Sequence, residues 1–291
     1  MALPIADVTF FGFRLLARRP LSILAWGAVG FVALVALILA VGVTAAVMGY
    51  QPAAAGAAPP PPAGAGALFA GLASIAGFIL VWAMFLAAAY RMTLRPEDRG
   101  FAYLRYGMAE LRLALLTAVI VIGTMGLWFL GFVLQAILSE AGAGAVAILT
   151  WLGLICLWAL LAVRLSLAGA VSFAEGGFGL VRSWTLTRGE FWPLFCVYLI
   201  LAILWVAATI VTSMVGFTIQ MLSGFGAMAA AGGSQADPTA VGGGFLLGAL
   251  VVLVLNLFVW ASEVAVLYAP HAEAYRRLSG ETPEKTSEIF A

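Results

Sequence analysis

Few residues in this chain of 291 could carry out chemistry. The only histidine is His271, in LYAPHAEAYRRL, and we interpret it as a solvated residue at a membrane interface rather than a general base. Cys156 and Cys196 lie in apolar stretches and are interpreted as small packing residues. Glu97 and Asp98 sit among arginines in TLRPEDRG, which is typical of a solvated loop. Because HExxH, GxSxG, CxxC and Walker-type motifs are also missing, we expect no catalytic residue, no metal and no cofactor.

Two charged residues fall inside apolar stretches, where a lone charge is unfavourable. Arg164 and Glu263 lie at similar predicted depths, one or two helical turns from the same membrane face. We therefore predict an intramembrane polar pair between Arg164 and Glu263, which could form part of a functional polar site. The alternative is that Arg164 extends to the lipid headgroups on its long side chain while Glu263 takes up a proton or a water.

The motif Phe-x-x-x-Arg occurs three times: FFGFR at 10–14, FAYLR at 101–105 and FGLVR at 178–182. Each copy precedes an apolar stretch, which suggests a three-fold repeat of an interfacial helix plus a transmembrane hairpin, although chance could also produce so short a motif. In the second copy Leu104, Met108 and Leu111 would form the apolar stripe of such a helix. The alternative is short helices packed on neighbouring loops. The candidates for lipid contact at the interface are Arg14, Arg105, Arg182, Arg188 and Trp184.

The composition defines the elements that must position these residues. The chain is 64% hydrophobic and 9% charged, and its mean hydropathy is +1.11. Six apolar stretches are each long enough to cross a membrane as a helix: 21–49, 67–90, 113–138, 145–168, 193–222 and 245–269. We therefore predict an all-α, polytopic integral membrane protein, with residues 1–291 forming a single six-helix domain.

The basic residues are confined to alternate connections. Connections 50–66, 139–144 and 223–244 contain no Lys or Arg, while all 14 basic residues lie before, between or after the other crossings or near their ends. The positive-inside rule then places both termini in the cytoplasm. The expected location is the plasma membrane, specifically the bacterial inner membrane.

One part of the sequence resembles a known family. RLSLAGAVSFAEGGFGLVRSWTLTRGEFWPLF (164–195) and AYRRLSG (274–280) resemble the membrane-domain family attached to some glycerophosphoryl diester phosphodiesterases and also found as stand-alone membrane proteins. The letters that carry it are Arg164, Ser166, Leu167, Glu175, Gly176, Arg182-Ser183-Trp184, Thr187-Arg188-Gly189 and Phe191-Trp192. The resemblance implies a multi-helix membrane domain without assigned active-site residues. We expect the phosphodiesterase domain itself to be absent.

Three classes of function remain open. The first is a non-enzymatic membrane module that binds lipids or a protein partner, and the expected partners are anionic headgroups on the cytoplasmic side and a membrane protein, with no nucleic acid. The second is a transporter or permease component for a small or lipidic substrate. The third is an intramembrane enzyme acting on lipid headgroups, which the lack of catalytic motifs disfavours most.

Overall fold

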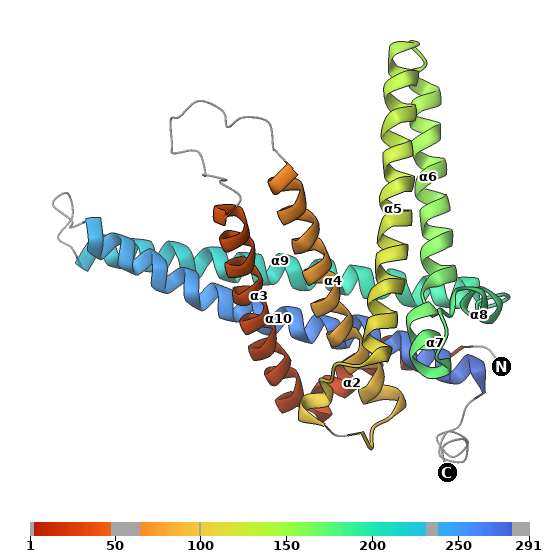
Figure 1. Cartoon of the computed structure of the whole chain (residues 1–291), viewed down its shortest axis with the longest axis horizontal. Helices are drawn as coiled ribbons and strands as arrows, with labels where there is room; N and C mark the ends of the chain where they lie inside the picture. Colours follow the sequence, from red (N-terminus) through yellow and green to blue (C-terminus); the bar gives the residue numbers. More distant parts are fainter. Residues whose placement is uncertain (1–2, 48–64, 99, 231–237, 281–291) are drawn as a thin grey trace. The chain divides into compact units, whose positions relative to one another are not determined.

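A computed structural model describes residues 3–47, 65–98, 100–230 and 238–280. Across these residues the secondary structure is helical, as Figure 1 shows. The elements are α1 (Ile5–Thr9), α2 (Phe11–Arg18), α3 (Pro20–Val47), α4 (Ala65–Leu94), η1 (Phe101–Tyr103), α5 (Met108–Glu140), α6 (Gly144–Leu165), α7 (Ala168–Glu175), α8 (Leu180–Leu186), α9 (Phe191–Ala230) and α10 (Pro238–Ser279). Most of the predicted connection 50–66, residues 231–237 of the connection 223–244, and the tail after Gly280 lie outside the described residues.

Six helices are long and apolar enough to cross a membrane: α3, α4, α5, α6, α9 and α10. This confirms the prediction of an all-α, multi-pass membrane protein. In each helix only 17–33% of the most apolar window is buried within the protein, so most apolar side chains are left for lipid. Helices suit this environment because every backbone group inside them finds its partner within the same segment.

The chain divides into two compact units, which we describe separately. Unit 1 contains residues 1–12, 75–198 and 268–291, and unit 2 contains residues 13–74 and 199–267.

In unit 1 the core forms around the C-terminal half of α4. Ala87, Ala88 and Ala89 are fully buried there, next to Tyr90, which is 2% exposed. Small side chains allow a close approach, and α7 uses this at Gly169, where an added Cβ would lie 2.5 Å from the Tyr90 Oη. The ring of Phe173 in α7 lies 6.2 Å from the ring of Tyr90. Short helix α7 is therefore packed against α4.

Also in unit 1, α5 and α6 form a long antiparallel hairpin (Figure 1). The turn between them uses Gly142 at φ 70°, a left-handed conformation that suits glycine. Along the hairpin Trp151 stacks on Trp128 at 5.5 Å and meets Phe132 edge-on at 5.3 Å. These aromatic contacts hold the two helices together where few polar groups are present.

In unit 2, glycines allow helices to approach each other. Gly248 of α10 faces Gln220 and Ser223 of α9, and Gly216 of α9 faces Val252 of α10. These contacts are of the small-residue kind that supports helix association in membranes, where the hydrophobic effect between helices is weak.

The structure corrects one of the three predicted interfacial helices. Two of the three Phe-x-x-x-Arg segments form short helices, α2 and α8. The middle one forms the single turn η1, with Ala102 and Tyr103 at positive φ (49° and 63°), and continues in extended backbone at Leu104. Gly107 is also extended, so Met108 and Leu111 belong to the start of α5 instead of an interfacial helix. The short helix of the predicted repeat is therefore present in two of the three segments.

Candidate functional site

Unit 1 contains a cavity of about 660 Å³ between helices α4, α5, α6, α7, α8 and α10. Its size falls within the range of about 300–1,000 Å³ that is usual for small-molecule sites. Leucine, isoleucine, valine and tryptophan side chains form most of its wall, including Leu86, Leu116, Ile120 and Leu161. None of the described residues that line it is Lys, Arg, Asp or Glu. The cavity wall therefore suits hydrocarbon rather than an ion.

A few polar side chains interrupt this apolar wall. Tyr90, Ser166, Tyr268 and His271 all line the cavity. The His271 ring is stacked between two tyrosine rings, with its centroid 4.8 Å from that of Tyr198 and 5.4 Å from that of Tyr268. Phenols, a hydroxyl and an imidazole offer hydrogen bonds without a fixed charge, except when the histidine is protonated. The cavity is thus amphipathic.

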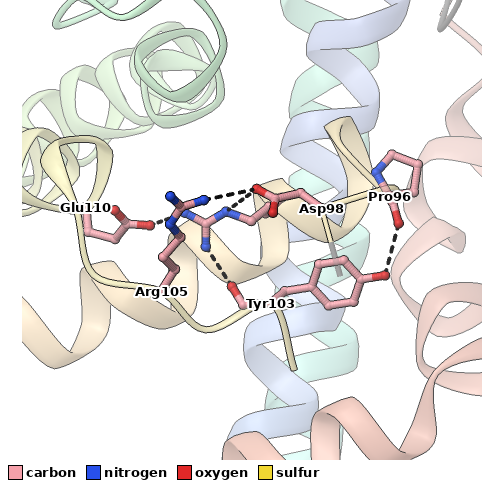
Figure 2. Close-up of polar contacts among 6 residues, drawn as sticks. Pro96, Asp98, Tyr103, Arg105 and Glu110 are labelled. Atoms are coloured by element: carbon pink, nitrogen blue, oxygen red, sulfur yellow. Dashed lines mark hydrogen bonds and ion pairs between the residues drawn. The ribbon is translucent and has the colours of Figure 1, made fainter. Parts of the chain in front are cut away.

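Next to the cavity, α4 is tied to the start of α5 by a buried arginine. Figure 2 shows this group, which we call the Arg91 clasp: Arg91 with Asp98, Tyr103, Arg105 and Glu110. Arg91 Nη2 pairs with Glu110 Oε1, Nη1 donates to the Tyr103 carbonyl at 2.6 Å, and Nε lies 3.6 Å from Asp98 Oδ2. The side chains of Arg91 and Glu110 are only 6% and 2% exposed.

The Arg91 clasp positions part of the cavity wall. Tyr90 is the neighbour of Arg91 in α4, and Leu113 lies one turn beyond Glu110 in α5, so both sides of the ion pair adjoin residues that line the cavity. The guanidinium of Arg91 also lies 5.5 Å from the ring centroid of Phe173 in α7. The clasp therefore links α4, α5 and α7.

Arg164 has a different environment at the C-terminal end of α6. Its guanidinium carbon lies 5.4 Å from the Trp184 ring centroid and 5.8 Å from that of Phe191. Its backbone carbonyl accepts a 2.8 Å hydrogen bond from Ser183 Oγ, which holds α8 against the end of α6. Nε and Nη1 of Arg164 are buried and have no hydrogen-bond partner among the described residues.

The predicted partner of Arg164 belongs to the other unit. Glu263 lies in α10 within unit 2, beside the Trp205 side chain. Arg164 lies in unit 1. The pair between Arg164 and Glu263 therefore stays a prediction.

The predicted interfacial residues are accessible. Arg14 in α2, Arg188 after α8 and Trp184 in α8 are exposed. Arg105 is 70% exposed, 3.9 Å from Asp98, and Arg182 is 53% exposed, with its Nε 3.4 Å from Glu175 Oε1. These positions allow lipid contact, which stays a prediction for all five.

Three interpretations from the sequence need correction. His271 is only partly exposed, stacked in the cavity wall, rather than simply solvated. Asp98 takes part in the Arg91 clasp, whereas Glu97 is exposed as expected. Cys156 is exposed on α6 and so packs against little of the protein, while Cys196 is half-buried.

The buried carboxylates were not predicted from the sequence. Glu110 pairs with Arg91, and Glu273, 1% exposed, pairs with Arg276 at 2.5 Å and Arg277 at 2.6 Å. The spacing of Glu273 to these arginines, three and four residues along α10, was a signal for the second group. For Glu110 and Arg91, the only signal in the sequence was their opposite charge on either side of the connection between α4 and α5.

Together these features define a class: a six-helix membrane protein with an amphipathic cavity in one unit. No known protein family, curated protein or solved structure matches the chain. The resemblance to the membrane-domain family therefore remains a prediction. Among the described residues no group of three His, Cys, Asp or Glu side chains could hold a metal ion.

Proposed function

We propose that this protein is a non-enzymatic membrane protein that binds a lipid in the cavity of unit 1. The observation that carries this proposal is the cavity itself, which combines an apolar wall with a few hydrogen-bonding groups and has no charged residue in its described lining. An acyl chain would contact the apolar wall. Ester or hydroxyl groups would find partners at Tyr90, Ser166, Tyr268 and His271.

The uncharged wall favours lipid binding over the other two classes. A transporter coupled to ions commonly carries charged groups on its pathway, and an enzyme needs an activated nucleophile or a general base beside its substrate. The sequence segregation of basic residues supports a plasma membrane location, that of a bacterial inner membrane, with both termini in the cytoplasm.

The cavity can be tested with a pair of glycines on α5. Gly123 lines the cavity and has nothing within 4 Å of an added Cβ, so Gly123→Leu should place a side chain in the cavity without a clash. Gly126 also has open space but does not line the cavity, so Gly126→Leu is the matched control. Native mass spectrometry of the purified protein should show bound lipid in the wild type and in Gly126→Leu, and at least a several-fold loss in Gly123→Leu. Equal lipid retention in both variants, or none in the wild type, would refute the proposal.

The orientation can be tested with exposed positions on the two sides. Ala141, in the turn between α5 and α6, and Thr185, in α8, are both exposed. Each is replaced singly, as Ala141→Cys or Thr185→Cys, in a background lacking Cys156 and Cys196. An impermeant maleimide added to intact cells should label the cysteine at 141, and should label the one at 185 only after lysis. The reverse pattern would overturn the orientation.

A further inference from the structure

Arg164 is half-buried and positively charged, and two of its nitrogens are buried. A guanidinium donates its N–H groups in its own plane, whereas the rings of Trp184 and Phe191 contact it as π systems. The rings therefore stabilise the charge but do not accept the donors of Nε and Nη1, which lie buried without a partner among the described residues. A buried charged donor left without an acceptor is strongly unfavourable, so a further acceptor is needed.

Four other arginines of unit 1 have acceptors within the protein. Arg91 has Glu110, Arg182 has Glu175, and Arg276 has Glu273. Arg112 also has an unpartnered Nε, but its Nη1 donates to the Gly176 carbonyl. Arg164 differs because no side-chain or carbonyl acceptor for its guanidinium is found in the described part of the chain.

The place of Arg164 connects it to the cavity. The next two residues in the chain, Leu165 and Ser166, line the cavity, and so does Leu180 at the start of the α8 helix that carries Trp184. An amphiphile with its hydrocarbon in the cavity would have its polar group close to this end of α6.

Two acceptors could serve Arg164: the Glu263 carboxylate expected from the sequence, and a phosphate. Glu263 lies in unit 2, beside the Trp205 side chain. Guanidinium groups bind phosphate oxygens through charge-assisted hydrogen bonds, and Nε and Nη1 of Arg164 offer two buried donors without a partner among the described residues. We propose that Arg164 binds the phosphate of the lipid whose hydrocarbon occupies the cavity, so that the ligand is a phosphate-bearing lipid. This inference rests on the proposed function.

The test compares two lipids with the same acyl chains. The purified full-length protein is equilibrated in mixed micelles with equal amounts of dioleoylphosphatidate and dioleoylglycerol, and bound lipid is counted by native mass spectrometry. The wild type should prefer phosphatidate by about tenfold or more. Arg164→Gln should lose most of that preference while keeping its binding of dioleoylglycerol. Arg18→Gln, which removes an exposed arginine of α2 that is not among the candidates for lipid contact, should keep the preference.

Additional arms keep the test decisive. Arg164→Lys keeps the charge without the donors of the guanidinium and should show an intermediate preference. This variant covers the case in which Arg164→Gln does not fold. An excess of inorganic phosphate should not displace phosphatidate; displacement would mean a site for free phosphate and would overturn the proposal. Equal binding of both lipids by the wild type, or an unchanged preference in Arg164→Gln, would also overturn it. If the wild type binds neither lipid, the proposed function fails as well.

Discussion

Two arginines of unit 1 lie near the ends of membrane helices and have opposite surroundings. Arg91, in the last turn of α4, is surrounded by protein acceptors: Glu110, Asp98 and the Tyr103 carbonyl. Arg164, in the last turn of α6, has two aromatic rings and unpartnered nitrogens. Arginine can therefore have two different roles at the end of a membrane helix. Where the protein supplies the acceptors, the arginine holds helices together, and where it does not, the arginine is available to a ligand.

The largest expected effect is at the Arg91 clasp. Glu110→Gln removes the charge opposite Arg91 while both side chains stay buried. Leaving a buried charge without its partner costs about 3–5 kcal/mol, and since Asp98 and the Tyr103 carbonyl still contact Arg91, the free energy of unfolding should fall by up to that amount. Equilibrium unfolding by sodium dodecyl sulfate in mixed micelles measures it.

The control within the same clasp is Arg105→Gln. Arg105 is 70% exposed and lies 3.9 Å from Asp98, and exposed pairs of this kind contribute at most about 1 kcal/mol. A loss below about 1 kcal/mol for Glu110→Gln as well would show that the clasp does not hold α4 to α5.

A smaller effect is expected at Gly169, in the α7 helix that begins just after Arg164 and packs beside Arg91. An added Cβ would lie 2.5 Å from Tyr90 Oη and 3.0 Å from its Cε2, and Tyr90 is buried. Gly169→Ala should therefore lower the free energy of unfolding by about 1–3 kcal/mol, the usual cost of overpacking.

The Gly169 prediction has an internal check. Tyr90→Phe removes the closest atom and should restore part of the stability in the double variant, measured in the same unfolding assay. Gly177→Ala is the control, since nothing lies within 4 Å of its Cβ. Equal stability of Gly169→Ala and Gly177→Ala would contradict the close approach of α7 to α4.

The smallest expected quantity is the coupling between Arg164 and Glu263. The phosphate proposal predicts that Arg164→Glu and Glu263→Arg act independently, with a coupling free energy within about 0.5 kcal/mol. The ion pair predicted from the sequence instead requires the double variant to recover much of the folded yield lost in each single variant. Folded yield and unfolding of the two single variants and the double variant decide between them. Recovery would give Arg164 a protein acceptor and remove the contrast with Arg91.

The long helices could be predicted from the sequence alone. Their apolar runs exceed the membrane thickness, so the predicted stretch 21–49 and the observed helix Pro20–Val47 nearly coincide. Arg164 was also found from the sequence, because a charge inside an apolar run is rare.

The local packing of unit 1 could not be predicted in the same way. A helical wheel assumes regular backbone, so it joined Leu104 to Met108 across Gly107 and did not detect the left-handed turn at Ala102. The contact between Arg164 and Trp184 requires α8 to fold back on α6, which hydrophobic periodicity does not specify. The cavity depends on six helices at once, and no local pattern encodes it.

The sequence separation of the Arg91 contacts has a consequence for biogenesis. The acceptors of Arg91 follow it by 12 residues at Tyr103 and 19 residues at Glu110, so the clasp can close as soon as the start of α5 has been synthesised. The hydrogen bond from Tyr275 to Glu175 spans 100 residues and must wait for the end of α10. Chains fold from the N-terminus during synthesis, so the α4–α5 pair assembles early, whereas the cavity gains Tyr268 and His271 only when the last helix is complete. In a nascent chain the contact between α4 and α5 therefore forms first, and the cavity is complete only as translation finishes.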